Sequence, residues 1–505
     1  MRRFVCIHGH FYQPPRENPW TGKIEEEESA RPFHDWNERI TSDCYAPNAA
    51  SPLLDERGRI AQLVNNYSWI SFDFGPTLLR WLESHYSELY ESIIDAERSS
   101  MKRFGGHGSA MAQVYNHMIM PLADPTDKRT QVRWGVEDFE RRFGRYPEGM
   151  WLPETAVDLD TLEALAEAEI KFTLLSPDQA SAVRKAGAED WVDVSGGRVD
   201  PRRAYSCNLP SGRSIDLFFY DRPLSTNIAF GNLLQSGDAF ADALLQGFSG
   251  TGDLQLVNVV SDGETYGHHH KNGNVVLSHC LSRIDGSGLA SIANYGLFLS
   301  LAHPTHEVRI IERTSWSCAH GVERWKSNCG CGADIRPGYG QEWRAPLRVS
   351  MDWLRDRLVG IYNQEGSKVF IDPRVAANEL ASVADDDDAA LQKYIIRHQR
   401  SKLSPEEMKK AIRLLKMFGF SALMYASCGW FWEDISRIES VQGLRYAAIS
   451  MELAEEVTGV SLEPEFIRML EAAPSNDTKF KTGSRVYVAL AKAPKAKPWW
   501  TATEE

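Results

Sequence analysis

The stretch GMWLPETAVDLDTLEALAEAEIKFTLL, residues 149–175, joins a short apolar run to a second one through a turn and a helical pattern. Gly149–Leu152 and Phe172–Leu175 have the length and composition of buried strands. Leu159–Ala168, rich in Leu, Ala and Glu, favours a helix. A strand, a helix and a strand in this order predict a parallel pair, since alternating strands and helices build parallel sheets or barrels.

The same alternation extends over the first three fifths of the chain. It predicts further strands at Phe4–Ile7, Trp69–Phe72, Ile215–Tyr220 and Leu254–Val260, and a helix at Gly75–Glu83. Beyond about Ser315 only helical patterns follow, at Ala345–Tyr362, Pro373–Ala381, Leu391–Arg397, Pro405–Phe418 and Val441–Val457. We therefore expect an α/β domain over residues 1–315, a helical domain over 316–490 and a loose tail over 491–505.

The composition narrows the classes of function. A formal net charge of −13 disfavours nucleic acid and anionic membranes as partners, because both require a basic surface. The 15 tryptophans favour carbohydrate, since aromatic faces stack on sugar rings, although Trp is also a common core residue. Eight cysteines are too few for a disulfide framework. No apolar signal segment follows Met1–His10 and no apolar run is long enough to span a membrane, so we expect a cytoplasmic protein.

Polar side chains stand directly after the predicted strands. His8 and His10 follow the first strand, Glu154 follows Gly149–Leu152, and Asp221 follows Ile215–Tyr220. In parallel α/β folds the carboxyl ends of the strands form one face, and that face carries the active site. We therefore expect these side chains to converge.

Each position also has a plain structural interpretation. The two histidines could be hydrogen-bonded core residues, Glu154 could belong to the first turn of a helix, and Asp221 could cap one. The segment VSDGETYGHHHK, residues 260–271, is dense in Asp, Glu and His, which indicates binding of sugar hydroxyls, a metal site or a hydrogen-bonded loop. Two converging carboxyl groups are what cleavage of a glycosidic bond requires.

Four segments, taken in order, resemble glycoside hydrolase family 57. They are HGHFYQPP (residues 8–15), GMWLPETAVD (149–158), LFFYDRPLSTNIAF (217–230) and DGETYGHHH (262–270). The resemblance implies an incomplete (β/α)7 barrel followed by an all-helical C-terminal domain. It also implies a retaining glycosidase or glucan transferase that acts on α-linked glycans. TSWSCAHGVERW (314–325) and MYASCGWFWEDIS (424–436) are similar to an uncharacterised helical domain that accompanies one branch of the family.

The resemblance implies that Glu154 is the nucleophile and Asp221 the general acid/base. The remaining residues expected to bind the carbohydrate substrate are His8, His10, Gln13, His117, Trp151, Asp262, Glu264, His268 and Trp430. For Trp430, packing of the helical domain is the alternative. No cofactor is expected. The opening His-x-His is followed by Phe11-Tyr12-Gln13, which departs from the His-x-Pro-Tyr/Phe spacing of the family's amylases.

Two further hypotheses concern metals and binding. A deacetylase-type or α-mannosidase-type hydrolase would use His8 and His10, with Asp221 or the run His268–His270, to hold a metal, and a noncatalytic glycan-binding protein would use none of these residues for chemistry. Separately, Cys318, His320, Cys329 and Cys331 could form a structural zinc site, a reduced loop or a redox pair.

Overall fold

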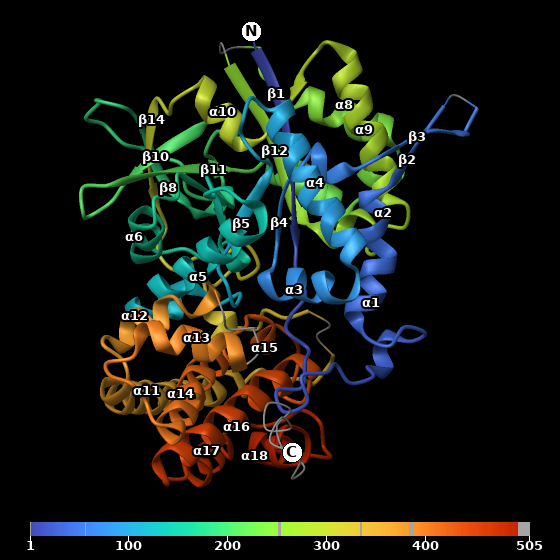
Figure 1. Cartoon of the computed structure of the whole chain (residues 1–505). Helices are drawn as coiled ribbons and strands as arrows, with labels where there is room; N and C mark the ends of the chain where they lie inside the picture. The colour runs from blue at the N-terminus through green and yellow to red at the C-terminus, as the bar shows by residue number, and fades with distance from the viewer. Residues whose placement is uncertain (1, 56, 251–253, 334–335, 383–387, 493–505) are drawn as a thin grey trace. The chain divides into compact units, whose positions relative to one another are not determined.

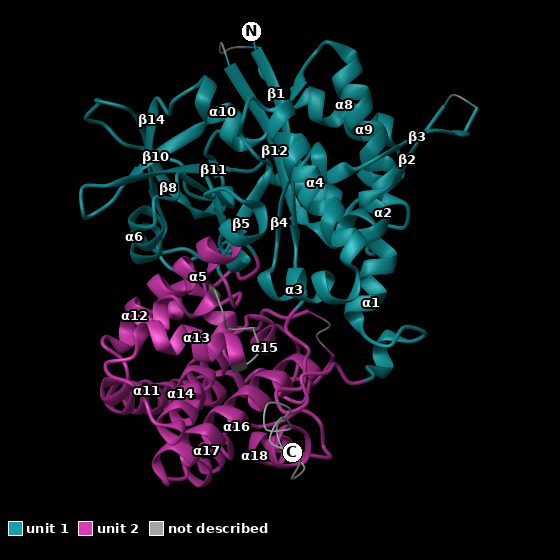
Figure 2. Cartoon of the chain, viewed as in Figure 1, with its two compact units in different colours: residues 1–13, 26–114, 139–316 teal, residues 14–25, 115–138, 317–505 magenta. Residues whose placement is uncertain are grey.

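The computed structural model of the chain describes residues 2–55, 57–250, 254–333, 336–382 and 388–492. The chain forms two compact units, shown in Figure 2. Unit 1 contains residues 1–13, 26–114 and 139–316, and unit 2 contains residues 14–25, 115–138 and 317–505. Each unit is therefore built from several segments of the chain. The predicted tail falls, from residue 493 onward, outside the described residues.

Unit 1 is built on a barrel of parallel strands. Its members among the described residues are β1 (Arg2–Phe11), β4 (Ser71–Phe74), β5 (Ala110–Gln113), β6 (Met150–Trp151), β7 (Phe172–Leu175), β11 (Ser214–Phe219) and β12 (Leu254–Asp262). The order β12-β1-β4-β5-β6 continues through a parallel bridge between Gly149 and Phe172 to β7 and β11. The Asp221 N–H donates to the Asn258 carbonyl at 2.8 Å, which brings the end of β11 to β12. The predicted fold class, an incomplete (β/α)7 barrel followed by helices, is confirmed by this strand order. Figure 1 shows β1, β4, β5, β11 and β12 among these strands.

Helices and smaller strands follow the barrel strands along the chain, and one helix, Pro125–Phe143, has residues 125–138 in unit 2 and 139–143 in unit 1. The helices are α1 (Trp36–Ile40), α2 (Ala46–Ala49), α3 (Pro76–His85), α4 (Ser87–Arg103), α5 (Pro125–Phe143), α6 (Leu159–Glu167), α7 (Arg222–Phe230), α8 (Gly237–Gln246), α9 (Gly273–Ser287) and α10 (Tyr295–Leu301). The added strands are β2 (Ser51–Leu54), β3 (Ile60–Val64), β8 (Ala180–Lys185), β9 (Val192–Asp193), β10 (Ala204–Asn208), β13 (Ser291–Ile292) and β14 (His306–Ile310). The order β7-β11-β10-β14-β8-β9 makes a side sheet that grows from the barrel.

Strand β1 runs through the middle of the barrel sheet and continues further than its apolar run suggests. It pairs with β12 up to His10–Asp262 and with β4 up to Phe11–Phe74. The expectation that the two histidines follow the strand is therefore wrong, because pairing on both sides keeps the backbone extended through them. Side chains two residues apart in a strand share a face. His8 and His10 thus continue the row begun by Phe4 and Cys6, which lie in the buried barrel core.

Unit 2 is helical over its C-terminal part, as predicted. Its helices there are α11 (Arg344–Val369), α12 (Pro373–Asn378), α13 (Asp388–His398), α14 (Pro405–Leu423), α15 (Cys428–Phe431), α16 (Ile438–Thr458), α17 (Glu463–Leu470) and α18 (Gly483–Val486). Helix α14 begins with a capping box, in which the Ser404 hydroxyl accepts from the Glu407 N–H and the Glu407 side chain accepts from the Ser404 N–H. In the described part of the chain, no helix has both the length and the apolar character that crossing a membrane requires.

Candidate active site

Three buried side chains form a hydrogen-bonded group inside the barrel. Nε2 of His8 lies 3.1 Å from Oδ1 of Asp73, and Nδ1 of His10 lies 2.8 Å from Oδ2 of the same carboxylate. The other ring nitrogen of His8 lies 3.0 Å from the Ser71 hydroxyl. Asp73 and His8 are completely buried, and His10 is 5% exposed. One carboxylate therefore fixes the orientation of both rings.

Within this group, His10 and Asp73 each stabilise the charged form of the other. Burial alone lowers the pKa of His10, but the carboxylate of Asp73 outweighs it and raises the pKa to about 9. Burial also tends to raise the pKa of Asp73, yet the two imidazoles hold it below its ordinary value. For His8 burial prevails and its pKa is lowered. The group at neutral pH is thus a charged His10, an ionised Asp73 and a neutral His8.

Trp151, at the end of β6, links the histidines to the next part of the site. Its ring stacks on His10 with centroids 4.7 Å apart and on His8 at 5.3 Å. On another side it meets Trp316 edge-on at 5.1 Å. Trp316 in turn lies 6.3 Å from the ring of Tyr220, at the end of β11. The three rings Trp151, Trp316 and Tyr220, which we call the aromatic group, connect the carboxyl ends of separate barrel strands.

Glu154 stands in a turn of unusual backbone shape directly after β6. Its φ of 58° and ψ of 20° lie in the left-handed region, and Thr155 follows with φ 51°. Such conformations are uncommon for side chains other than glycine and are a strain that clusters at functional sites. Helix α6 begins only at Leu159, where Asp158 is the cap. The interpretation of Glu154 as a residue of the helix's first turn therefore does not hold.

Trp316 and Gln179 hold this turn in place. The Trp316 indole N–H donates to Oε2 of Glu154 at 3.0 Å, and its backbone N–H donates to the Glu154 carbonyl at 3.0 Å. The buried Gln179 amide donates to the Thr155 carbonyl at 2.8 Å, and its oxygen accepts from the Thr155 hydroxyl at 2.9 Å. The same amide also reaches the carbonyl of Thr314 at 3.1 Å. The carboxylate of Glu154 is thus aimed by contacts from far along the chain.

Asp221 follows β11 and also caps helix α7. Its Oδ1 accepts from the Leu224 N–H at 3.0 Å, so the structural interpretation as a cap is correct for one oxygen. Burial raises the pKa of Asp221, although the Leu224 N–H and the cation of Arg202 act in the opposite direction. The side chain is partly exposed. A carboxyl group with a raised pKa and one oxygen fixed is suited to proton transfer.

The end of β12 and the turn that follows it add two more acids to the site, Asp262 and Glu264. The buried Glu264 accepts a short hydrogen bond of 2.5 Å from the Tyr45 hydroxyl and one of 3.3 Å from the Tyr12 N–H. Burial, with the nearby Asp262 carboxylate, raises the pKa of Glu264 to about 7. The pKa of Asp262 is raised as well, because protein atoms surround its carboxyl group, although the residue is exposed on one side. The charges of both acids act on His10, which places them beside the histidine group.

Two more predicted residues of unit 1 lie at the edge of this acidic group. The Gln13 side chain hydrogen-bonds Tyr45, the residue that donates to Glu264. His268 lies with Nδ1 2.9 Å from Asp43 Oδ2 and meets the ring of Trp36 edge-on at 5.9 Å. Gln13 therefore touches the acidic group through Tyr45, whereas the ring nitrogen of His268 is bound to a different carboxylate.

Two predicted residues belong to unit 2. His117 has φ 53° and is buried, with Nδ1 2.6 Å from the Ser427 hydroxyl. Trp430 is 2% exposed and stacks on Tyr425 with centroids 6.2 Å apart. In this structure Trp430 packs inside its own unit. Substrate binding by these two residues stays a prediction.

Four residues of the site are not among those predicted from the sequence. They are Asp73, Gln179, Tyr45 and, as a partner of Glu154, Trp316. Asp73 carries the same signal as the selected residues, because it is a lone acid at the end of an aromatic strand, SFDF. Gln179 and Trp316 act through contacts across 24 and 162 positions, respectively. No local pattern announces such contacts.

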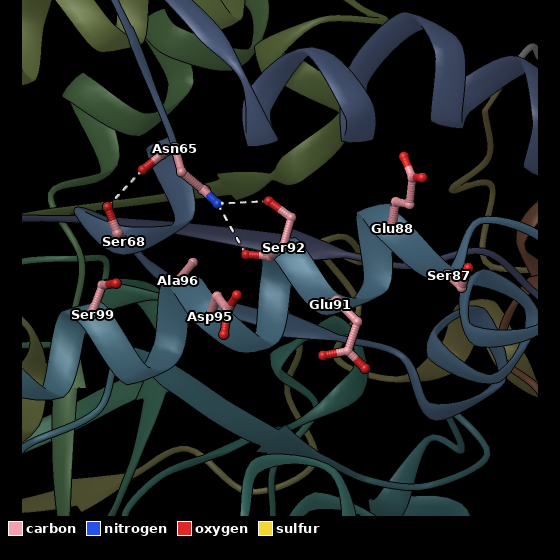
Figure 3. A pocket seen from close by; sticks show the side chains of 9 residues that line it. All are labelled: Asn65, Ser68, Ser87, Glu88, Glu91, Ser92, Asp95, Ala96 and Ser99. Atoms are coloured by element: carbon pink, nitrogen blue, oxygen red, sulfur yellow. Dashed lines mark hydrogen bonds between the residues drawn. The ribbon is translucent and has the colours of Figure 1, made fainter.

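Metal binding by the barrel histidines stays a prediction. Within the described residues, side chains that could hold a metal ion jointly come together at Cys318, His320, Cys329 and Cys331. A separate surface hollow of about 530 Å³ lies along helix α4 and is lined by Ser and acidic side chains (Figure 3). It shares no residue with the site around Glu154 and Asp221.

Known proteins match both parts of the chain. A profile described as "Glycosyl hydrolase family 57" matches residues 8–293, and one described as "Domain of unknown function (DUF3536)" matches residues 339–498. Alpha-amylase 1 of Dictyoglomus thermophilum is 29% identical over 107 residues, which are 21% of this chain and 15% of that protein. The chain thus matches only a small part of the amylase's length.

Solved structures with the same fold cover almost the whole chain. An exo-type maltose-forming amylase from Pyrococcus sp. ST04 superimposes with a TM-score of 0.70 at 15% identity, over 100% of this chain and 94% of that one. A family 57 branching enzyme from Thermococcus kodakaraensis gives a TM-score of 0.54 at 14% identity, over 98% of each chain. The profile covers more than half of the sequence, from the first histidine of the site to the strand beside β1. The chain belongs to glycosyl hydrolase family 57.

Proposed function

We propose that this protein cleaves or transfers α-linked glucan chains with retention of anomeric configuration. Glu154 is the nucleophile and Asp221 the general acid/base. The observation that carries the proposal is that one aromatic group contacts Glu154 and the residue next to Asp221. Trp316 donates to Glu154 and meets the ring of Tyr220 edge-on, and Tyr220 directly precedes Asp221.

The environments of the two acids suit different roles. Glu154 receives a hydrogen bond from an indole N–H, which fixes the orientation of a carboxyl group that has to attack in line. Asp221 has a raised pKa, which favours the protonated form that a general acid needs. Pairs of carboxyl groups with different environments are typical of glycosidases.

The reaction then has two steps. In the first, a carboxylate oxygen of Glu154 attacks the anomeric carbon, the bond to the leaving oxygen breaks, and Asp221 gives that oxygen its proton. In the second, Asp221 takes a proton from water or from a sugar hydroxyl, whose oxygen attacks the anomeric carbon and releases Glu154. Attack by water gives hydrolysis, and attack by a sugar gives transfer. The charged His10, which lies beside Asp262 and Glu264, is suited to bind a sugar hydroxyl.

The substrate class rests on the relatives. The matching proteins are an amylase, a maltose-forming amylase and a branching enzyme. All three act on α-glucans by their names, so an α-linked glucan is the substrate to try first. A cytoplasmic location stays a prediction.

The test is chemical rescue of a nucleophile variant. Glu154→Ala should lower turnover of an α-glucoside that carries a good leaving group by about 10⁴-fold or more, because the covalent step is lost. Azide should restore activity and give a β-glycosyl azide, since it attacks from the face that Glu154 vacates. NMR of the product reads the anomer directly.

The exposed carboxylate of Glu189 provides a matched control. Glu189→Ala should keep full activity and show no response to azide. The proposal fails if Glu154→Ala retains activity, or if no small nucleophile rescues it while its fold is intact. A panel of α-glucans, α-galactosides and α-mannosides, with products separated by length, would distinguish hydrolysis from transfer.

A further inference from the structure

Unit 2 contains a compact group of soft ligands that the proposed reaction does not use. The ligand atoms of Cys318, His320, Cys329 and Cys331 all lie within 4.8 Å of one another. The sulfurs of Cys318 and Cys329 are 4.0 Å apart, and the Cys331 sulfur is 3.4 Å from Nδ1 of His320. We call these four side chains the thiol cluster. None of its cysteines forms a disulfide.

These separations match a tetrahedral metal site better than a disulfide. A disulfide joins its sulfurs at about 2.05 Å, roughly half the distance between Cys318 and Cys329. With Zn–S near 2.3 Å and Zn–N near 2.0–2.1 Å, the ligand atoms of a tetrahedral site lie about 3.5–3.8 Å apart. The observed 4.0 and 3.4 Å bracket that range. These two separations are therefore near those of a zinc site, and all four ligand atoms lie within 4.8 Å of one another.

The backbone turns sharply at both short motifs. Gly330, between Cys329 and Cys331, has φ 81°, and Gly321, directly after the Cys318–His320 pair, has φ 82°. Glycine adopts such left-handed turns without a steric penalty, so the turn at Gly330 accommodates the tight C-x-C spacing.

Several backbone N–H groups are directed at the sulfurs. The Arg324 and His320 N–H groups hydrogen-bond the Cys318 sulfur. The Ala319 N–H donates to the Cys331 sulfur. The Cys331 N–H lies 3.4 Å from the Cys329 sulfur. Backbone donors of this kind commonly surround and orient the sulfur ligands of structural metal sites.

A buried cation beside the thiol cluster has no acidic partner. Arg344 is completely buried, and its Nη1 lies 4.0 Å from the Cys329 sulfur. Its other contacts are to uncharged oxygens, namely the carbonyls of Cys331, Phe431 and Trp432 and the amide of Gln341. Among the described residues no carboxylate pairs with it. A buried charge needs a partner, and zinc with three thiolates and one neutral imidazole carries a charge of about −1.

We propose that Cys318, His320, Cys329 and Cys331 bind one structural zinc ion. Four protein ligands close the coordination sphere, as in structural rather than catalytic sites. The ion would join the two ligand pairs to the start of helix α11 through Arg344, and through it to residues 431–432. Its function would be to order the segment that precedes the helical domain.

The test compares metal content in matched cysteine variants. The full-length protein, purified from zinc-supplemented cells without chelators, should contain about one zinc per chain by inductively coupled plasma mass spectrometry. Cys329→Ser/Cys331→Ser should contain less than about a tenth of that amount. Cys428→Ser removes a thiol of the same unit outside the thiol cluster and should keep the zinc. Replacement by cobalt should give the intense visible bands of a tetrahedral thiolate site.

A second measurement covers the case in which the double variant does not fold. A zinc chelator should lower the Tm of the wild-type protein by about 5 °C or more, and added zinc should restore it. The proposal is overturned by zinc-free wild-type protein, by iron in place of zinc, by equal zinc in the double variant, or by a Cys318–Cys329 disulfide in mass spectra. None of these readouts depends on glucan activity, so the proposed function stands or fails separately.

Discussion

Two buried charged groups, one in each unit, differ in how their charge is balanced. In the barrel, Asp73 lies between His8 and His10 and bonds both rings, so the group contains its own counter-charge. In unit 2, Arg344 is equally buried, and among the described residues its hydrogen-bonding partners are carbonyl and amide oxygens and a cysteine sulfur. The barrel group balances its charge with its own side chains. The second group becomes complete only if the thiols are ionised, and a metal ion is what keeps neighbouring thiolates stable.

The two units therefore differ in whether their buried charge depends on a component from outside the chain. The barrel site is preorganised by its own side chains, as electrostatic catalysis requires. The thiol cluster depends on an ion for its structure. Variants in the barrel should therefore change activity or pH dependence, while metal removal should act on the stability of unit 2.

The largest expected effect lies in the barrel. Asp221→Asn should lower kcat/KM by about 10³-fold, because it removes the proton donor, while Glu264→Gln should cost only about tenfold. Wild-type activity should fall as pH rises through the raised pKa of Asp221, since the ionised form cannot donate. That alkaline limb should be absent from Asp221→Asn. An equal loss in Glu264→Gln would transfer the acid role to Glu264, whose pKa of about 7 makes it the rival.

The next effect breaks the balanced group itself. Asp73→Asn should destabilise the protein by about 3 kcal/mol, because it removes the carboxylate that balances the buried charge of His10. Urea unfolding measures the free energy, and Asp190→Asn, at an exposed position, is the control. A loss below about 1 kcal/mol would show that the group is not the ion pair described here.

The same pair sets a pH dependence of stability. The folded pKa of His10, about 9, exceeds that of a free histidine, about 6.5. Its contribution to stability is therefore complete below pH ~6.5 and is lost as pH rises through 9. Asp73, with a lowered pKa, contributes above its unfolded pKa near 3.9 and loses this contribution as pH falls through the folded value. The stability difference between wild type and Asp73→Asn should be largest between pH ~4 and ~6.5, in unfolding curves recorded across pH.

The smallest effect concerns the turn that carries Glu154. Gln179→Ala should lower kcat about tenfold with little change in KM, because the nucleophile is less well aimed but the sugar still binds. A purely structural role would lower stability and leave kcat of the folded protein unchanged. Steady-state kinetics on one α-glucan separates the two outcomes.

The parts of the fold and of the candidate site that depend on local sequence patterns could be predicted. Strand β7 occupies the predicted residues Phe172–Leu175, and Glu154 and Asp221 follow their strands as expected. Strand β5, Ala110–Gln113, was missed because AMAQ is short and lacks β-branched residues. The hydrogen bond from Trp316 to Glu154 and the carboxylate that Asp73 shares between two histidines join residues far apart in the sequence. A local sequence pattern cannot predict such contacts. The left-handed backbone at Glu154 is equally invisible, because nothing in PETAV demands it.

That backbone has a consequence for how the protein can be improved. Position 154 has the conformation that glycine adopts without cost, so Glu154→Gly would relieve strain while it removes the carboxylate. A screen that selects only for heat resistance would enrich such inactive variants. Engineering for robustness must therefore keep position 154 fixed and look for gains elsewhere, because here durability and turnover pull in opposite directions.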